Sequence, residues 1–203
     1  MAGGKTKGPM EKFKNKYRIP SARALWWNYA DKGLYFITIC TAGHKYLFGN
    51  INNNEMILSD IGVIVQQEWE KSFEIRKELF CDAFVIMPNH IHGIVRIDKT
   101  NHDGAIPPVE THGRASLQRQ STNKPQNHGI AYRSPKSISS FVAGFKSSTT
   151  KRINEYRSTP KLSVWQTRFH DHIIRNDDDY IHIKRYVETN AINWGNDKFF
   201  KES

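Results

Sequence analysis

The sequence contains little cysteine and no long hydrophobic run. Of its 203 residues only two are cysteines, Cys40 and Cys81, which lie far apart in apolar contexts. This excludes the disulfide framework of small secreted domains and gives no CxxC metal site. The longest apolar runs span a handful of residues, and the lysine-rich N-terminus lacks the apolar segment of a signal peptide. We therefore expect a cytoplasmic protein without a membrane span.

Acidic residues are scarce relative to basic ones. Thirty Lys and Arg against twenty Asp and Glu give a formal net charge of +10. Such an excess indicates a polyanionic partner, with nucleic acid ahead of an anionic membrane surface, although solubility alone also explains it. A hydrophobic content of 38% with 12% aromatic residues suffices for one core of ordinary size. We expect one domain with extensions.

Two segments are too polar to contribute to a core. Residues 1–23 carry seven lysines and arginines against the single acid Glu11, which predicts a basic N-terminal arm. Residues 99–136 are dominated by Asn, His, Gln, Pro, Gly and Ser, which predicts a flexible insertion. The remainder divides into a single domain at 24–194, interrupted by this insertion, and a C-terminal tail at 195–203.

The apolar periodicity predicts the order of the elements. Alternation predicts a strand at 34–41, followed by a loop that Gly43 and Gly49 bracket. A helix follows from Ser59 or Asp60 to about Lys77, then strands at 83–87 and 90–97 with a Pro88-Asn89 turn, then a helix from 135 or 137. The last strand lies within 164–175, and a final helix runs from 176 to about 193. This order predicts an α+β, ferredoxin-like split βαβ fold with an antiparallel sheet and an added C-terminal helix.

The stretch MPNHIHGIV places two histidines at the start of a predicted strand. Residues i and i+2 of a strand share a face, so the imidazoles of His90 and His92 can meet at one divalent ion while Ile91 points into the core. Two ligands are too few for such a site, so a third must come from elsewhere. An exposed polar strand face is the alternative.

Two further groups of polar residues are candidates. His170 and His172 also share a strand face, but Asp171 between them favours a solvated strand end. On the final helix, Tyr186 and Asn190 lie four residues apart and project together along one edge. From the helix alone, an amphipathic tyrosine with its hydroxyl at the surface and a polar residue near a helix end are the favoured explanations.

Several blocks together resemble a known family. ICTAGHKYLFG, VIMPNHIHGIV, GFKSSTTKRIN, VWQTRFHDHIIRN and YIHIKRYVETNAINW occur in this order between about Arg18 and Trp194. They resemble the single-tyrosine transposases of the HUH endonuclease superfamily and, more narrowly, the REP-associated tyrosine transposases.

The resemblance implies a set of site residues and a reaction. His90 and His92 would bind a divalent ion, Mg²⁺ or Mn²⁺, Asn190 would be the third ligand, and Tyr186 on the C-terminal helix would be the nucleophile. Attack on single-stranded DNA would give a 5′-phosphotyrosine link and a free 3′-hydroxyl that can rejoin DNA in transposition. No nucleotide cofactor is needed.

The expected partner is single-stranded DNA at hairpin-forming element ends. We expect phosphate contacts from the N-terminal arm and from Lys146, Lys151, Arg152 and Arg175. The sequence is compatible with a monomer or a homodimer. The alternative function is a non-catalytic single-stranded DNA- or RNA-binding module on the same ferredoxin-like sheet, with the histidines idle.

Overall fold

The computed structural model describes residues 12–13, 16–17, 30–98 and 135–200. Within the predicted N-terminal arm it gives two short paired strands, β1 (Lys12–Phe13) and β2 (Lys16–Tyr17). The rest of the predicted arm, and nearly all of the predicted 99–136 insertion, lie outside the described residues.

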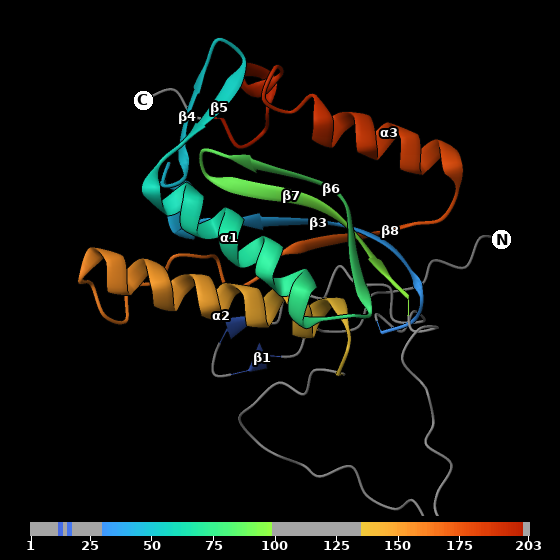
Figure 1. Ribbon diagram of the computed structural model, residues 1–203, viewed down its shortest axis with the longest axis horizontal. Helices are drawn as coiled ribbons and strands as arrows, with labels where there is room; N and C mark the ends of the chain where they lie inside the picture. The colour runs from blue at the N-terminus through green and yellow to red at the C-terminus, as the bar shows by residue number, and fades with distance from the viewer. Residues whose placement is uncertain (1–11, 14–15, 18–29, 99–134, 201–203) are drawn as a thin grey trace, which may run out of the picture.

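A four-stranded antiparallel sheet forms the centre of the molecule (Figure 1). Its strands are β3 (Gly33–Cys40), β6 (Leu79–Met87), β7 (His90–Ile97) and β8 (His170–Ile174), in the spatial order β6-β7-β3-β8. Because β7 lies between β3 and β6, the β3-α1-β6 unit is a split βαβ, and the ferredoxin-like prediction is confirmed. Residues Met87 and His90 pair across the predicted Pro88-Asn89 turn.

Three helices cover the two faces of the sheet. α1 (Asp60–Ile75) and α2 (Ile138–Arg157) pack on one face, and α3 (Asp177–Glu188) lies on the other (Figure 1). Side chains cap all three N-termini at the predicted helix starts, with Ser59, Ser137 and Asn176 each accepting a backbone N–H. α3 ends five residues before the predicted 193, so Asn190 lies in the turn after the helix. None of the helices in the described part of the chain is long and apolar enough to cross a membrane.

The segments between the main elements hold one feature that the sequence analysis did not predict. The predicted loop from Gly43 to Gly49 is present and opens with the 3-10 turn η1 (Ala42–His44), and after it β4 (Gly49–Asn52) and β5 (Glu55–Leu58) form a hairpin. Asn53 and Asn54 both have positive φ, the backbone of a two-residue hairpin turn. β4 carries a single apolar residue, Ile51, so apolar alternation does not mark this hairpin in the sequence. The last strand, β8, lies within the predicted 164–175 and starts at His170; residues before it form an extended segment in which Trp165 bridges to Thr41.

The alternation of side chains divides the core into two unequal parts. On the α1 and α2 face, Tyr35 and Ile37 of β3 and Trp69 of α1 belong to the larger cluster. Gly93 permits this packing, since a Cβ atom there would lie 2.6 Å from the Trp69 ring. The α3 face holds a smaller cluster built on Phe36, Ile94, Ile174 and Val187. Beyond that cluster the sheet presents polar side chains toward the C-terminal segment.

Candidate active site

The two histidines of β7 lie side by side on the α3 face and are buried. His90 pairs with Cys40 and His92 with Thr38 across the β3–β7 ladder. Their exposed fractions are 0% and 1%, so the alternative of an exposed polar strand face is wrong. Their Nε2 atoms are 3.0 Å apart. Buried imidazoles with facing nitrogens are expected to share a proton or an ion, because facing lone pairs repel.

Asn89 fixes the proton of His90. Its Nδ2 donates to the carbonyls of Phe199 (2.8 Å) and His44 (3.4 Å), so its Oδ1 is the atom that faces His90 Nδ1 at 2.8 Å. An amide oxygen only accepts, and His90 Nδ1 must therefore carry the proton. The neutral His90 ring is left with a lone pair on Nε2, directed at the centre of the site.

Thr38 gives His92 a partner that can change roles. Its hydroxyl lies 2.8 Å from His92 Nδ1 and can either donate or accept. With no ion present, His92 can donate from Nε2 to His90 while Thr38 donates to Nδ1. Rotation of the Thr38 hydroxyl would move the proton to Nδ1 and free a second lone pair at Nε2.

Burial keeps both rings neutral. It lowers the pKa of His90 to about 4, against the smaller opposing effect of the Asp197 charge. Burial, followed by the neighbouring His90, also lowers the pKa of His92 well below its ordinary value. Neutral imidazole is the form that binds metals, so the pair is ready to act as ligands without losing protons at neutral pH.

Tyr186 and Asp197 complete the group. The Tyr186 hydroxyl lies 3.2 Å from His92 Nε2 and donates to Asp197 Oδ2 at 3.2 Å. The tyrosine ring also contacts the His92 ring at a centroid distance of 5.1 Å. Burial, then the charge of Asp197 and its hydrogen bond, raise the pKa of Tyr186 to about 12. The resting arrangement therefore keeps the phenol protonated.

Asn190 contacts the carboxylate rather than the histidines. Its Nδ2 donates to Asp197 Oδ2 at 3.3 Å, and its side chain is 2% exposed. Its Oδ1 is buried without a hydrogen-bond partner, an unusual cost for an amide. Tyr186 and Asn190, predicted to project together, thus meet at the same carboxylate oxygen.

Sequence reasoning missed Asp197, because the segment that carries it was predicted as a tail. After α3 the chain makes a 3-10 turn, η2 (Trp194–Asn196), and returns over the histidines. Phe199 packs on His90 at 4.6 Å and stacks on His44 at 5.5 Å between ring centroids. The Phe199 N–H donates to Asp197 Oδ1 at 2.7 Å and so orients the carboxylate. The aromatic residues of this segment were the signal for packing, since a solvated tail rarely carries them.

The geometry suits a divalent metal ion. One nitrogen each from His90 and His92 and one oxygen from Asp197 lie within 4.8 Å of one another. Ligands at right angles on bonds of about 2.1 Å are roughly 3 Å apart, which matches the two Nε2 atoms. A cation would also give the lone pairs and the Asp197 charge a common partner. Among the described residues, no other group of three His, Cys, Asp or Glu side chains meets this test.

The other sequence candidates lie elsewhere. His172, of the competing histidine pair, bonds Asp179 Oδ2 at 2.8 Å, and both His170 and His172 are exposed. Arg152 is held by the buried Glu68 at 2.9 Å and by Gln67 at 2.8 Å, so its charge is largely used within the fold. Lys146 bridges to two backbone carbonyls, whereas Lys151 and Arg175 are exposed.

A protein of Haemophilus influenzae, described as an uncharacterized protein, is 35% identical to this chain over 180 residues. The match covers 89% of this chain and 92% of that protein. This chain belongs to the same family. No protein-family model matches the chain.

The likeness to a solved structure concerns the fold. The structure of a REP-associated tyrosine transposase bound to a REP hairpin is similar with a TM-score of 0.52 and 19% identity. The match covers 85% of this chain and 75% of that chain. The likeness to the transposases predicted from the sequence blocks is thus confirmed at the level of fold.

Proposed function

We propose that this chain is a divalent-metal-dependent endonuclease and strand transferase acting on single-stranded DNA, with Tyr186 as the nucleophile. One observation carries the proposal: the Tyr186 hydroxyl lies within hydrogen-bonding distance of His92 Nε2 and Asp197 Oδ2, and that His92 nitrogen in turn faces His90 Nε2 at 3.0 Å. The fold shared with a REP-associated tyrosine transposase supports it, as does the net charge of +10. By analogy with that hairpin-bound protein, the substrate is a single strand next to a DNA hairpin.

In the proposed reaction the Tyr186 oxygen attacks a backbone phosphorus. The new bond is a 5′-phosphotyrosine ester, and the bond that breaks is the one to the 3′-oxygen, which leaves with a proton as a 3′-hydroxyl. The phenol proton passes to Asp197 or to solvent. Because the ester keeps the energy of the broken bond, a 3′-hydroxyl can later attack it and release Tyr186. The exchange needs no nucleotide cofactor.

We assign His90, His92 and Asp197 as the ligands of the ion, Mg²⁺ or Mn²⁺, and Asn190 as the residue that positions Asp197. When bound, the ion supplies a Lewis acid for the phosphoryl oxygen and a charge that offsets the Asp197 carboxylate, which otherwise raises the pKa of Tyr186. After rotation of its amide, Asn190 would add its unpaired Oδ1 as a fourth ligand.

The test is formation of a covalent adduct. Protein and Mn²⁺ are incubated with a library of labelled single strands that flank hairpins, and the products are separated under denaturing conditions. We expect an adduct of higher mass in the native protein and none in Tyr186→Phe, which removes one oxygen and leaves the ring contacts in place. Peptide mapping should locate the DNA on Tyr186.

Tyr180→Phe is the matched control, since Tyr180 lies on the same helix but packs against the small α3-face cluster. It should form the adduct normally. An adduct that persists in Tyr186→Phe would refute the mechanism. Tight binding of intact strands by the native protein, with no cleavage in Mn²⁺ or Mg²⁺, would instead favour the non-catalytic binding module.

A further inference from the structure

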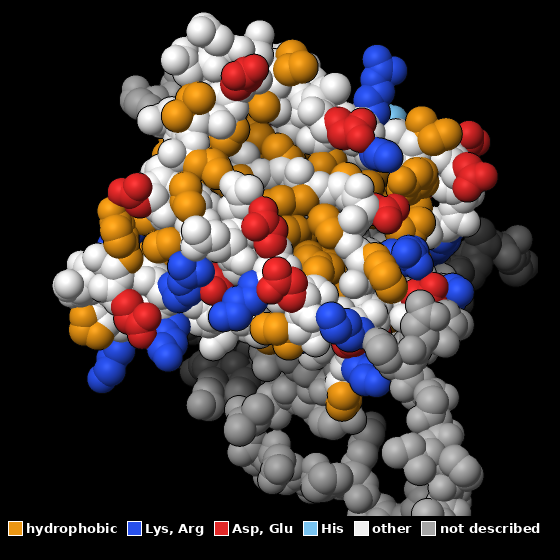
Figure 2. Space-filling view, viewed as in Figure 1, with side chains coloured by type: hydrophobic (Ala, Val, Ile, Leu, Met, Phe, Trp, Pro, Cys, Tyr) orange, Lys and Arg blue, Asp and Glu red, His pale blue; other side chains and the backbone are white. Residues whose placement is uncertain are grey.

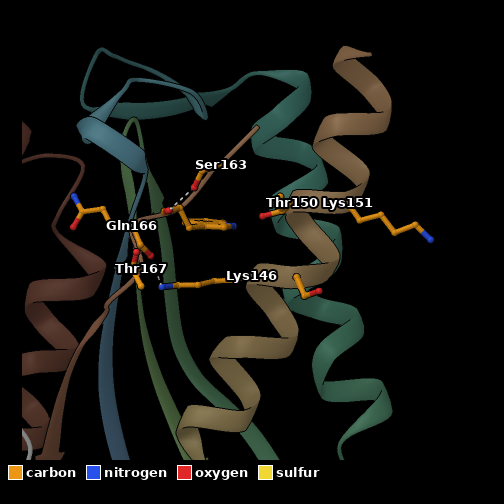
Figure 3. A pocket seen from close by; sticks show the side chains of 8 residues that line it. Lys146, Thr150, Lys151, Ser163, Gln166 and Thr167 are labelled. Atoms are coloured by element: carbon orange, nitrogen blue, oxygen red, sulfur yellow. Dashed lines mark hydrogen bonds between the residues drawn. The ribbon is translucent and has the colours of Figure 1, made fainter. Parts of the chain in front are cut away.

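A polar hollow opens between α2 and the extended segment that precedes β8. Its volume is about 470 Å³, within the range of about 300 to 1,000 Å³ of small-ligand sites. Lys146, Ser147, Thr150 and Lys151 line it from α2, and Ser163, Trp165, Gln166 and Thr167 line it from the other side. Figure 3 shows the Lys146 side chain reaching from α2 toward Thr167, while Lys151 extends away from the gap.

The wall opposite α2 is held in place from both sides. Lys146 Nζ donates to the carbonyls of Gln166 at 2.8 Å and Arg168 at 3.1 Å. Trp165 donates from Nε1 to the buried Thr149 hydroxyl at 2.8 Å and packs on Phe48 and Phe145. The hollow is therefore preformed, which lowers the entropic cost of binding.

The hollow lies at the same end of the sheet as the candidate active site. The Gln166 N–H donates to the carbonyl of Cys40 at 2.9 Å, and Cys40 pairs with His90 on the next strand. At about 4.8 Å per strand, the backbone of Gln166 is roughly 10 Å from that of His90. The Gln166 amide also meets the His44 ring at 2.9 Å, and His44 stacks on Phe199 beside His90.

Positive charge lies on both sides of this end of the sheet. Lys146 Nζ at the hollow donates to Gln166, whose N–H donates to Cys40, and Lys198 Nζ lies 4.7 Å from the centre of the Phe199 ring that packs on His90, so both ammonium groups lie near this strand end. Over the α1 and α2 face as a whole, basic side chains are interspersed with acidic ones (Figure 2). The hollow combines an ammonium group with hydroxyl donors from Thr150 and Thr167, a set suited to a phosphate oxygen.

We propose that this hollow binds a backbone phosphate and its nucleotide in the single-stranded DNA flank next to the strand held at Tyr186. The inference rests on the proposed function, since it gives the same DNA strand a second point of attachment. Sites for single strands commonly track about 4 to 16 nucleotides, so a strand at Tyr186 would extend past Gln166. The Trp165 ring offers an apolar wall for the base or sugar.

The test introduces opposite charges at Thr167, an exposed residue that lines the hollow, and compares their effects on DNA binding. Fluorescence anisotropy with a 20-nucleotide oligo(dT) strand measures binding to the native protein, Thr167→Glu, Thr167→Lys and Gln67→Glu. We expect Thr167→Glu to weaken binding about tenfold at low salt and Thr167→Lys to strengthen it, because the charge lies next to a phosphate. Thr167→Glu should also reduce the slope of log affinity against log salt by about 0.7, one phosphate contact.

Gln67→Glu is the matched control, because it adds the same charge at an exposed position of α1 outside the hollow. Its affinity should stay within about twofold of the native protein. Equal weakening in both Glu variants would mean a general charge effect and would overturn the hollow as a site. No binding of oligo(dT) by the native protein would overturn the proposed function as well.

A second measurement locates the bound DNA strand on the native protein, without any substitution. A single strand containing 5-iododeoxyuridine is photocrosslinked to the native protein, which is then digested with trypsin. We expect DNA on the peptide from Leu162 to Arg168, which carries four residues of the hollow wall. Crosslinks confined to other peptides, in a protein that binds the strand, would overturn the hollow and leave the assignment of Tyr186 intact.

Discussion

The carboxylate of Asp197 stands 3.2 Å from the hydroxyl of Tyr186, although the two residues belong to different segments on either side of η2. Asn190 donates to the same Oδ2 atom, and the Phe199 N–H holds Oδ1. This carboxylate therefore connects the proposed nucleophile, the histidine pair and the C-terminal segment. Its two oxygens are oriented before any substrate or ion arrives, which is the condition for an efficient site.

Substitution of Asp197 should abolish strong metal binding. Asp197→Ala leaves two neutral imidazoles, too few for an ordinary site, and Mn²⁺ affinity should fall by about 100-fold or more. Asn190→Ala removes only the group that orients the carboxylate, so its loss should be about 10- to 100-fold. Isothermal titration with Mn²⁺ measures both. A larger loss in Asn190→Ala than in Asp197→Ala would restore Asn190 as the third protein ligand.

Asp197→Ala should also lower the pKa of Tyr186 in the metal-free protein. Without the negative charge and its hydrogen bond, the pKa of Tyr186 should fall from about 12 toward the value that burial alone gives. Ultraviolet titration of phenolate in the metal-free protein, compared with the same titration of Asp197→Ala/Tyr186→Phe, isolates this group. An unchanged titration would mean that burial dominates and that Asp197 has little electrostatic effect on the phenol.

Asn89 should control metal affinity through His90. In Asn89→Ala the Nδ1 proton loses its acceptor, and Mn²⁺ affinity should fall about 10- to 100-fold. Asn89→Asp loses the same two donor contacts to Phe199 and His44 but keeps an oxygen facing His90. Asn89→Asp should therefore retain most of the Mn²⁺ affinity. Both variants should lose the stability that the two donor contacts provide. Nitrogen NMR of the imidazoles should show the Nδ1–H form of His90 in the native protein and in Asn89→Asp.

The sequence predicted the parts of this site that depend on local periodicity. The alternation in β7 places His90 and His92 on one face, and the Pro88-Asn89 turn starts the strand immediately before them. The order of strands and helices fixes the ferredoxin-like topology, because short connections between these elements allow few arrangements. The helix starts at Ser59 or Asp60, at 135 or 137 and at 176 were predicted for the same reason, because the caps that Ser59, Ser137 and Asn176 form there are local chemistry.

Asp197 and the burial of the histidines depend on long-range contacts instead. The chain after α3 turns back because Trp194, Phe199 and Phe200 pack against partners such as Tyr46 and His90. No period or spacing in the sequence encodes that return. The contact of Arg152 with Glu68 is also tertiary, since it joins α2 to α1 across 84 residues. The position of Arg152 on a predicted helix therefore showed neither that Glu68 is its partner nor that its charge is largely unavailable to DNA.

The buried histidines should make the metal-free protein sensitive to acid. Their pKa values are lower in the folded state than the ordinary 6.5, so the unfolded chain binds more protons between pH 6.5 and about 4. Stability should be fully present above pH 6.5 and decrease by the order of a few kcal/mol as pH falls to about 4. Urea unfolding in EDTA at several pH values measures this. His90→Gln/His92→Gln should show a shallower decrease, and an equal one would assign the acid sensitivity to other groups.

Gly93 should be required for the packing of the larger core cluster. A Cβ atom at this position of β7 would lie 2.6 and 2.7 Å from two atoms of the Trp69 ring, and that ring is enclosed by Phe84, Phe141 and Phe145. Because the ring has no free space in which to move, Gly93→Ala should destabilise the fold by about 1 to 3 kcal/mol. Gly195→Ala is the control, since a Cβ atom there has no neighbour within 4 Å among the described residues. Urea unfolding with tryptophan fluorescence should show a lower midpoint for Gly93→Ala alone. Equal midpoints for the two variants would mean that α1 can shift away from the sheet without cost, and the close approach of Trp69 to β7 would not be a constraint of this fold.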